Sequence, residues 1–380
     1  MRKPVVAILA ECPAVSKDLH QLGRPGGVGS TWLTQLSECF ESYSGEFQFH
    51  WITLDKKLKH IESSVHNSQF FHRLPSAKVT VDLLLGHLIA RRNLKNYLDI
   101  LSPSLIHVWG TENSYASILK HSKTPTILSM QGILTTYTRI GAFKKNWRAF
   151  LQHFYERAWL PYATIITCES EWGRNEIKKI APKAEIELVE YGVHPSFYQV
   201  KWQPDPRRPI FLFIGTIDYR KGMDVLLKAL KSSPTKKDYE VRIIGSGEYQ
   251  SSFEGLPNVR ILGNLPWLSV QQELAKAWAV LLPTRADTSP NVAKEARVVG
   301  VPVVTTPYGG QSGYIQHMEN GWILHPLTPE NLSKAMQTLS HDFSLVRSLG
   351  ARHHDRDRAY FRPERTAEGF IRLYKRMLAQ

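Results

Sequence analysis

Residues 281–310 read LLPTRADTSPNVAKEARVVGVPVVTTPYGG and hold the densest set of structural signals in the chain. An apolar run ends at Pro283, and a polar loop and a helical stretch follow it. A second apolar run, 301–305, then leads into a Gly309–Gly310 turn. Alternation of strand and helix on this scale is typical of a parallel sheet covered by helices. We therefore expect a βαβ unit here.

The helix in this segment has a recognisable start. Ser289 and Pro290 predict an N-cap and a first helical residue, because proline lacks only a hydrogen that the first turn leaves unpaired. The amides of Asn291 and Val292 would then point out of the positive end of the helix. Such a helix end is a binding site for anions.

Two carboxylates accompany this helix end. Asp287 precedes it, and Glu295 lies one to two turns inside it, roughly on the same side. Carboxylates beside an anion-binding helix end suit a ligand that carries both hydroxyls and phosphate, as a nucleotide sugar does. The alternative is a solvated acidic face of the helix.

The spacing in this segment resembles the donor-site signature of the retaining glycosyltransferases of family 4, the glycosyl transferases group 1. An acidic residue, seven intervening residues and a Glu precede A-x-x-x-G-x-P-V-V and Gly-Gly. The resemblance implies an α/β fold called GT-B, with two facing Rossmann-like domains, a donor cleft between them and a C-terminal helix that crosses back to the first domain. It also implies that Glu295 holds the ribose hydroxyls and that Asp287, usually Glu in the family, contacts the donor sugar.

A second segment, FIGTIDYRKGMDVLLKAL at 213–230, resembles the family's G-R-x-x-x-x-K-G motif. Its Gly is Gly215, and Lys221 matches the Lys that neutralises the donor diphosphate. Thr216 stands where the family has Arg, so Arg220 is the candidate to supply the missing charge. Positive charge stabilises a diphosphate leaving group as its negative charge develops. The alternative is a solvated Arg-Lys pair on the surface.

Three further residues are assigned to the donor by the same resemblance. Gly245 ends a strand in IIGSGEY, and Gly263 and Asn264 lie in PNVRILGNLP. The family places the first segment near the nucleotide and the second against the base.

A glycine-rich loop lies between the first expected strand and a helix that starts near Thr31. It contains Gly26, Gly27 and Gly29, and glycines let backbone amides come close to a phosphate or a sugar. The loop resembles the G-G-x-x loop of family 4, which approaches the donor phosphate and the acceptor. The alternative is a plain turn.

Gln131 and Gly132 follow an expected strand at the position where the family commonly has His-Gly or His-Asp, close to the reacting sugar. A glutamine donates and accepts hydrogen bonds but is neither an acid nor a base. A protein base at this position is therefore not expected.

The length of 380 residues predicts two domains. We place the first at 1–200 with a C-terminal helix at 363–379, and the second at 205–362. Helices are expected at 31–40, 81–98 and 224–230. The expected strands are 5–10, 47–54, 105–108, 126–130, 164–168, 185–189, 210–214, 240–244, 259–262 and 280–282.

Composition narrows the class of protein. A formal net charge of +14 is compatible with polyphosphate ligands, nucleic acid or an anionic membrane. Three cysteines without a C-x-x-C pair indicate a reducing compartment, and no run approaches the roughly 20 apolar residues that cross a bilayer. We expect a cytoplasmic protein, with the inner face of the membrane as a further location.

One segment, 141–163, has the pattern of a basic amphipathic helix and predicts peripheral contact with an anionic membrane. A helix packed on the sheet with this face inward is the alternative. The residues expected on its apolar face are Phe143, Trp147, Phe150, Leu151, Phe154 and Ala158, and the flanking cations are Lys144, Lys145, Arg148 and Arg157.

The resemblance implies a retaining glycosyltransferase, a hexosyltransferase by its family, and we expect it to be metal-independent and to use no cofactor. Its donor would be a UDP- or GDP-linked sugar, and its acceptor a hydroxyl of a lipid-linked molecule or of a growing glycan. Asp287, Lys221 and Glu295 would act on the donor. A non-catalytic nucleotide-sugar-binding homologue and a sugar-nucleotide epimerase or phosphorylase of the same fold stay open, while specific nucleic-acid binding is the least favoured.

Overall fold

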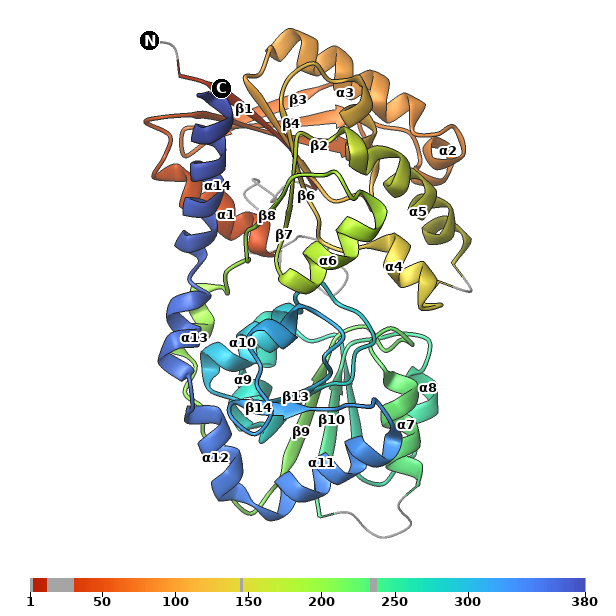
Figure 1. Cartoon of the computed structure of the whole chain (residues 1–380), viewed down its shortest axis with the longest axis vertical. Coiled ribbons are helices and arrows are strands. Elements are labelled where there is room, and N and C mark those ends of the chain that lie inside the picture. The colour runs from red at the N-terminus through yellow and green to blue at the C-terminus, as the bar shows by residue number, and fades with distance from the viewer. Residues whose placement is uncertain (1–2, 12–30, 144–145, 233–237, 380) are drawn as a thin grey trace. The chain divides into compact units, whose positions relative to one another are not determined.

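The computed structural model describes residues 3–11, 31–143, 146–232 and 238–379 (Figure 1). The described residues divide into two compact units. The first contains 3–11, 31–192 and the C-terminal segment 363–379, and the second contains 193–362. The predicted phosphate loop with Gly26, Gly27 and Gly29 lies outside the described residues.

The first unit is built on an eight-stranded sheet, counted over the described residues, in the order β3-β4-β2-β1-β5-β6-β7-β8. All of its pairings are parallel except that of β3 with β4 at one edge. The strands are β1 (Val5–Leu9), β2 (Gln48–Asp55), β3 (Glu62–His66), β4 (Gln69–Pro75), β5 (Leu105–Trp109), β6 (Thr126–Ser129), β7 (Ile165–Cys168) and β8 (Ile186–Leu188).

Helices cover both faces of this sheet. The described helices are α1 (Thr31–Glu41), α2 (Val79–Leu84), α3 (Leu88–Leu101), α4 (Leu134–Arg139), α5 (Trp147–Trp159), α6 (Glu171–Ile180) and α14 (Pro363–Leu378), with 3-10 helices η2 (Ser114–His121) and η3 (Leu160–Tyr162). One buried cluster joins α1 and α14 to β1, β2 and β5, and a second joins α3, η2 and α6 to the opposite face.

The C-terminal helix predicted at 363–379 is confirmed as α14 (Pro363–Leu378) and belongs to the first unit. Figure 1 shows α14 beside α1, and the Phe40 and Tyr374 rings of these helices lie 5.9 Å apart. The Tyr374 hydroxyl also lies 2.6 Å from His107 Nδ1 in β5. The chain therefore returns to its first sheet at its end.

The single helix predicted at 81–98 is wrong. The structure has two helices, and Gly86 and His87 between them have φ of 64° and 59°. The buried Asp82 carboxylate accepts hydrogen bonds from the amides of Ile89 and Ala90, at 3.0 and 3.2 Å. It thereby satisfies donors in the first turn of α3. The chain therefore breaks into two helices here, although the helical periodicity of the sequence continues without interruption.

The β3–β4 hairpin was not predicted. Its two-residue turn, Asn67–Ser68, has positive φ at both positions, which is the geometry of a tight hairpin connection. The strand β3 is exposed along its whole length, so it lacks the apolar residues that identify the other strands.

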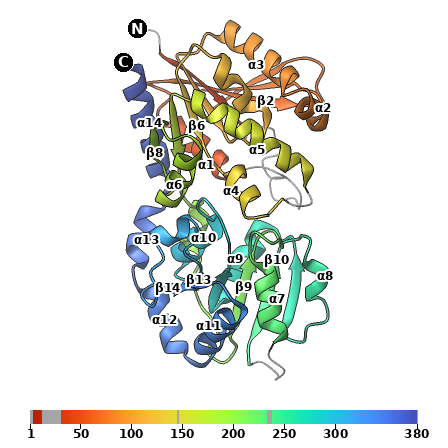
Figure 2. The same cartoon turned by 45° about the vertical axis from the view of Figure 1, so that its right-hand side comes forward.

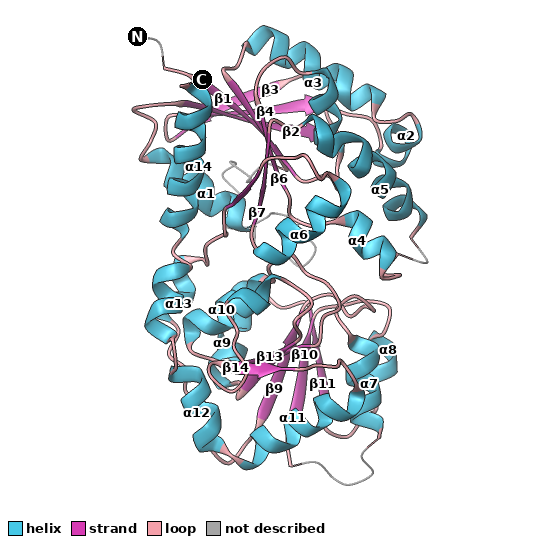
Figure 3. Cartoon of the chain, in the orientation of Figure 1, coloured by secondary structure: helices cyan, strands magenta, loops and turns pink. Residues whose placement is uncertain are grey.

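The second unit has a six-stranded parallel sheet, counted over the described residues, in the order β11-β10-β9-β12-β13-β14 (Figure 3). This is the strand order of dinucleotide-binding folds, with the reversal of direction between β9 and β12. The strands are β9 (Ile210–Ile214), β10 (Glu240–Ile244), β11 (Val259–Gly263), β12 (Ala279–Leu282), β13 (Val303–Thr305) and β14 (Gly321–Ile323).

Buried clusters again lie on both faces of the sheet. The described helices are α7 (Met223–Lys231), α8 (Gln250–Phe253), α9 (Trp267–Lys276), α10 (Asn291–Val299), α11 (Pro329–His341), α12 (Phe343–Ala351) and α13 (His354–Tyr360), with 3-10 helices η4 (Pro195–Gln199) and η5 (Gly310–Gly313). No helix of the described residues is long and apolar enough to span a bilayer.

Candidate active site

The predicted donor residues gather at the carboxyl ends of β9 and β12. These two strands are neighbours in the sheet, and the connections that leave them run in opposite directions along it. Ligands of open α/β sheets bind at such a point because the diverging loops leave a crevice there. The segment from Gly215 to Gly222 leaves β9, and the segment from Pro283 to Asp287 leaves β12.

One buried carboxylate joins both segments. Asp287 Oδ2 accepts hydrogen bonds from Lys221 Nζ at 2.5 Å and from Arg220 Nη1 at 3.0 Å. Burial alone would raise the pKa of the Asp287 carboxyl, but the two cations outweigh burial and lower its pKa below the ordinary value. Lys221 and Arg220, 66 and 67 residues away in sequence, thus converge on one oxygen.

The backbone brings these side chains together by close approach. Gly222 has φ of 73°, and a Cβ on it would lie 1.8 Å from the Pro283 carbonyl oxygen. Only glycine fits this position, both for its backbone conformation and for the space. The contact fixes the distance between the loop that carries Lys221 and the loop that carries Asp287.

A second set of contacts, which the sequence analysis missed, locks the two loops together. Arg285 donates two hydrogen bonds to the Asp224 carboxylate, at 2.7 and 2.8 Å, and its amide donates to the Arg220 carbonyl at 2.8 Å. The Asp218 carboxylate accepts from the Lys221 amide at 2.8 Å. The pattern D-x-x-K within a strand-to-helix turn is the only local signal for any of these contacts.

The predicted start of the helix is wrong by one residue. Pro290, with φ of −67° and ψ of 119°, is the N-cap, and α10 begins at Asn291. The reason is that the Pro290 carbonyl already accepts the first helical hydrogen bond, from Ala293 at 3.0 Å. Asn291 and Val292 are therefore the first two helical residues, whose amides have no acceptor within a helix.

Glu295 lies on α10 one turn from this start and is partly buried. Burial raises the pKa of its carboxyl to about 7, although the neighbouring Lys294 cation acts in the opposite direction. A carboxylate with little water around it accepts hydrogen bonds from ligand hydroxyls strongly, because no solvent competes.

The raised pKa of Glu295 predicts a pH dependence of stability. The folded-state pKa lies above the ordinary value of 4.5. Protonation of Glu295 therefore stabilises the folded chain fully below about pH 4.5, and this contribution is lost as the pH rises through about 7. From about pH 5 to about pH 8, the wild type should lose about 1–2 kcal/mol of unfolding free energy relative to Glu295→Gln, which cannot ionise.

Urea unfolding at both pH values measures this difference. The matched control is Glu254→Gln, which replaces an exposed carboxylate of the same unit and should follow the wild type at both values. Equal pH profiles for Glu295→Gln and the wild type would contradict the prediction.

A cavity of about 360 Å³ adjoins the loop after β9. Its lining includes four of the predicted donor residues, Gly215, Thr216, Gly245 and Asn264, and it lies at the carboxyl ends of β9, β10 and β11. Gly263, another predicted donor residue, has φ of 67°, and its carbonyl accepts a hydrogen bond from the Gly245 amide at 2.9 Å. These glycines bring the backbones of adjacent loops to the cavity wall.

Residues 196–355 match the family model described as Glycosyl transferases group 1. This match falls within the second unit, which carries the sequence pattern of the family. An uncharacterized glycosyltransferase of Methanocaldococcus jannaschii is 23% identical over 318 residues, which cover 80% of this chain and 83% of that protein.

Solved structures agree on the fold of the chain. Sucrose-phosphate synthase from Thermosynechococcus elongatus superposes with a TM-score of 0.78 at 18% identity, over 99% of this chain and 100% of that chain. Anabaena HepE in complex with UDP-glucose gives 0.69 at 14% identity, over 98% and 99%. The predicted GT-B architecture, two Rossmann-like units with a C-terminal helix that returns to the first, is confirmed.

In the first unit, Gln131 and Gly132 follow β6 at the carboxyl edge of the sheet. Glu112, which the sequence analysis missed, lies against the same turn, since a Cβ on Gly132 would be 2.9 Å from its Oε1. Burial raises the pKa of the Glu112 carboxyl to about 7 against backbone hydrogen bonds that lower it, and the nearby Glu156 raises it further. The position of Glu112 just after β5, at the carboxyl end of a strand, was the one sequence feature that could have identified it as a site residue.

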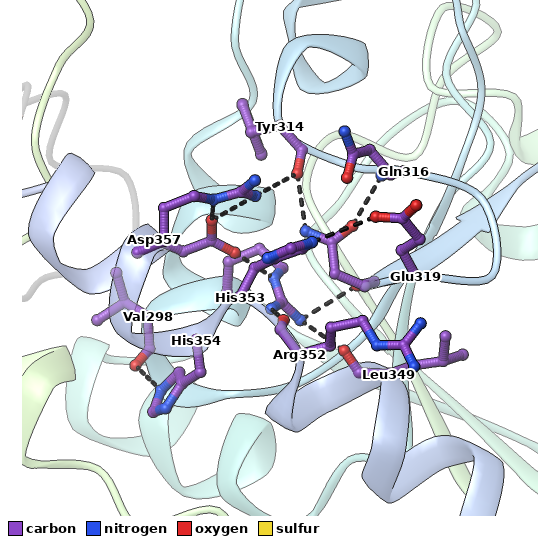
Figure 4. A network of polar contacts seen from close by, with 12 residues as sticks. Val298, Tyr314, Gln316, Glu319, Leu349, Arg352, His353, His354 and Asp357 are labelled. Carbon is purple, nitrogen blue, oxygen red and sulfur yellow. Dashed lines mark hydrogen bonds and ion pairs between the residues drawn. The ribbon is translucent and has the colours of Figure 1, made fainter.

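A buried ion pair joins α10, the helix that carries Glu295, to α13 (Figure 4). Arg297 is fully buried, and its Nε lies 2.8 Å from the Asp357 carboxylate of α13. Its remaining guanidinium donors bond the carbonyls of Asn320, Leu349 and Arg352 at 2.7–3.2 Å. These contacts of the Arg297 guanidinium fix the position of α10, the helix that carries Glu295.

Proposed function

We propose that this protein is a retaining glycosyltransferase that moves a hexose from a nucleotide-diphosphate sugar to a hydroxyl acceptor. The observation that carries the proposal is the convergence of Lys221, Arg220 and Asp287 where β9 and β12 end, beside the cavity that holds Thr216 and Asn264. Cations, a carboxylate and a recess lined by backbone match the three parts of such a donor, its diphosphate, its sugar and its base.

In the proposed mechanism Lys221 and Arg220 bind the diphosphate. The bond from the anomeric carbon to the phosphate oxygen breaks while the bond to the acceptor oxygen forms on the same face of the sugar. The acceptor proton moves to the departing phosphate oxygen, and the two cations stabilise the negative charge that remains. Asp287 orients the sugar hydroxyls, and Glu295 holds the ribose.

The amides at the start of α10 complete the phosphate site in this proposal. Asn291 and Val292 present unpaired donors at the positive end of the helix, directly after the loop with Ser289 and Pro290. Gln131 and Gly132 of the first unit would serve the acceptor or reacting-sugar side by hydrogen bonding alone. We place the reaction in the cytoplasm, with a lipid-linked molecule or a growing glycan as the acceptor.

A panel of UDP, GDP, ADP and their common sugar conjugates tests the donor. A ligand at about 100 times its dissociation constant adds about 2.7 kcal/mol to the unfolding free energy, which moves the melting midpoint by a few degrees. We expect a shift with one nucleotide family, lost in Glu295→Ala and preserved in Lys228→Ala, whose cation is exposed on α7.

Turnover then separates the remaining alternatives. A glycoside product whose anomeric configuration is inverted relative to the donor would contradict a retaining transfer. Binding without turnover on any acceptor would favour the non-catalytic sugar-binding homologue, to which the departures at Thr216, Gln131 and Asp287 point. Conversion of the donor without an acceptor would favour the epimerase.

A further inference from the structure

Large apolar side chains are exposed together on one part of the first unit. Of the fifteen exposed large hydrophobic residues among those the structure describes, three lie on α5 and three lie within 81–85, at the end of α2 and the residue after it. Each of these six is between 46% and 64% exposed. We call this set the α2–α5 surface: Val81, Leu84, Leu85, Trp147, Phe150 and Phe154.

The two helices touch, so the set is one surface. The Tyr155 hydroxyl of α5 donates to the Leu83 carbonyl of α2 at 3.1 Å, and the Tyr155 ring packs edge-on against His87 at 5.0 Å. Figures 1 and 2 both show α2 and α5 side by side. The inward residues Leu83 and Tyr155 make this contact, which leaves the outward residues of both helices to solvent.

The inward face of α5 already packs against the first unit and has its hydrogen bonds made. Gln152 and Glu156 are buried and bond the Thr111 carbonyl and hydroxyl, and Trp159 is buried in the core. The expectation that the aromatic face of this helix packs inward is therefore wrong. Phe150 and Phe154, with rings 5.5 Å apart, form an apolar stripe with no core to cover it.

The charges around this stripe have one sign. On α2 and α5 the only carboxylates are Asp82 and Glu156, and both are buried. The exposed charged side chains on these two helices are Arg148 and Arg157. The surface therefore presents apolar groups inside a cationic border.

We propose that the α2–α5 surface docks on an anionic lipid bilayer. Aromatic and aliphatic side chains on a helix face enter the boundary between headgroups and acyl chains, while cations contact acidic headgroups. The three aliphatic members on and after α2 favour lipid over nucleic acid, whose bases stack on aromatic rings. The inference deepens the proposed function, on which it rests for its consequence: the acceptor is lipid-linked.

Co-sedimentation of the full chain with vesicles tests the docking. We expect binding to vesicles of phosphatidylcholine with phosphatidylglycerol, weak binding to phosphatidylcholine alone, and loss at about 0.5 M salt. Phe150→Ser with Phe154→Ser should lower the partition coefficient about tenfold or more. Arg148→Gln with Arg157→Gln should lower it about fivefold for each cation removed.

Leu268→Ser is the matched control, since Leu268 is 65% exposed on α9 of the second unit. It should bind vesicles as the wild type does. If the phenylalanine variant fails to fold, the arginine variant alone carries the test, because its residues are exposed and solvated. The inference is overturned if anionic vesicles do not bind the wild type or bind both surface variants equally well.

Two further outcomes also overturn it. A wild type that is dimeric in solution and becomes monomeric in the phenylalanine variant would make the surface an interface between copies. Displacement from vesicles by nucleic acid at equal charge would make lipid the wrong partner. Donor-induced thermal shifts, measured without vesicles, should be unchanged in every surface variant, so failure of the docking and failure of the proposed transferase are distinguishable.

Discussion

Lys221→Ala should lower kcat/KM for sugar transfer about a thousandfold, because the variant loses a positioned donor to the charge that develops on the leaving diphosphate. The Lys221 side chain is 11% exposed and ends 2.5 Å from Asp287, so its cation is already in place before a ligand arrives. Initial rates of nucleoside diphosphate release at low donor concentration measure the effect.

Arg220→Ala should cost less, about tenfold to a hundredfold. Arg220 divides its guanidinium between the Asp287 carboxylate and the Ala286 carbonyl, at 3.0 and 3.3 Å, and its side chain is 19% exposed. Lys228→Ala, on the helix α7 that follows these two residues, is the control and should retain full activity. A Lys221→Ala enzyme within tenfold of the wild type would mean that the diphosphate binds elsewhere.

The ion cluster offers an internal check on this assignment. Asp287 compensates both cations in the absence of a donor, so Asp287→Asn removes the negative charge that competes with a phosphate for Lys221 and Arg220. Its affinity for nucleoside diphosphate should stay the same or rise, while its turnover of the sugar donor falls. Parallel losses of both affinities would instead assign the carboxylate a scaffold role.

Much of the fold was predictable because its strands are apolar runs bounded by turns. The runs at 210–214 and 240–244 correspond to β9 and β10 without change. The exposed strand β3 escaped because it carries no such run. The break between α2 and α3 escaped because its cause, the Asp82 carboxylate, acts through folded contacts on amides seven and eight residues away.

The candidate site divides in the same way. The family resemblance identified Lys221 and Asp287 as ligand contacts. Their ion pair with each other could not be predicted from the spacing of residues in the sequence, because it depends on the close approach of Gly222 to Pro283. Glu112 was missed because its pKa depends on burial and on Glu156, 44 residues later. Local signals identify which groups are present, whereas tertiary contacts set their charge.

Asp357→Ala should destabilise the second unit by about 3–5 kcal/mol, because it leaves the buried Arg297 guanidinium without its counter-charge. The pair lies 2.8 Å apart, and the two side chains are 0% and 2% exposed. Calorimetry measures the change, and the transition that a bound nucleotide raises identifies the second unit. Glu319→Ala, which breaks the half-exposed pair with His353 in the same network, should cost less than about 1 kcal/mol (Figure 4).

A double replacement distinguishes a scaffold from a donor contact. Arg297→Met with Asp357→Leu removes both charges and should recover most of the lost stability, since apolar residues of similar size replace buried ion pairs at little cost. Glu295 and the start of α10 are intact in that variant, so the nucleotide-induced shift should equal that of the wild type. A recovered fold without that shift would mean that the ion pair also sets the position of Glu295, and a cost below about 1 kcal/mol for Asp357→Ala would mean that it anchors nothing.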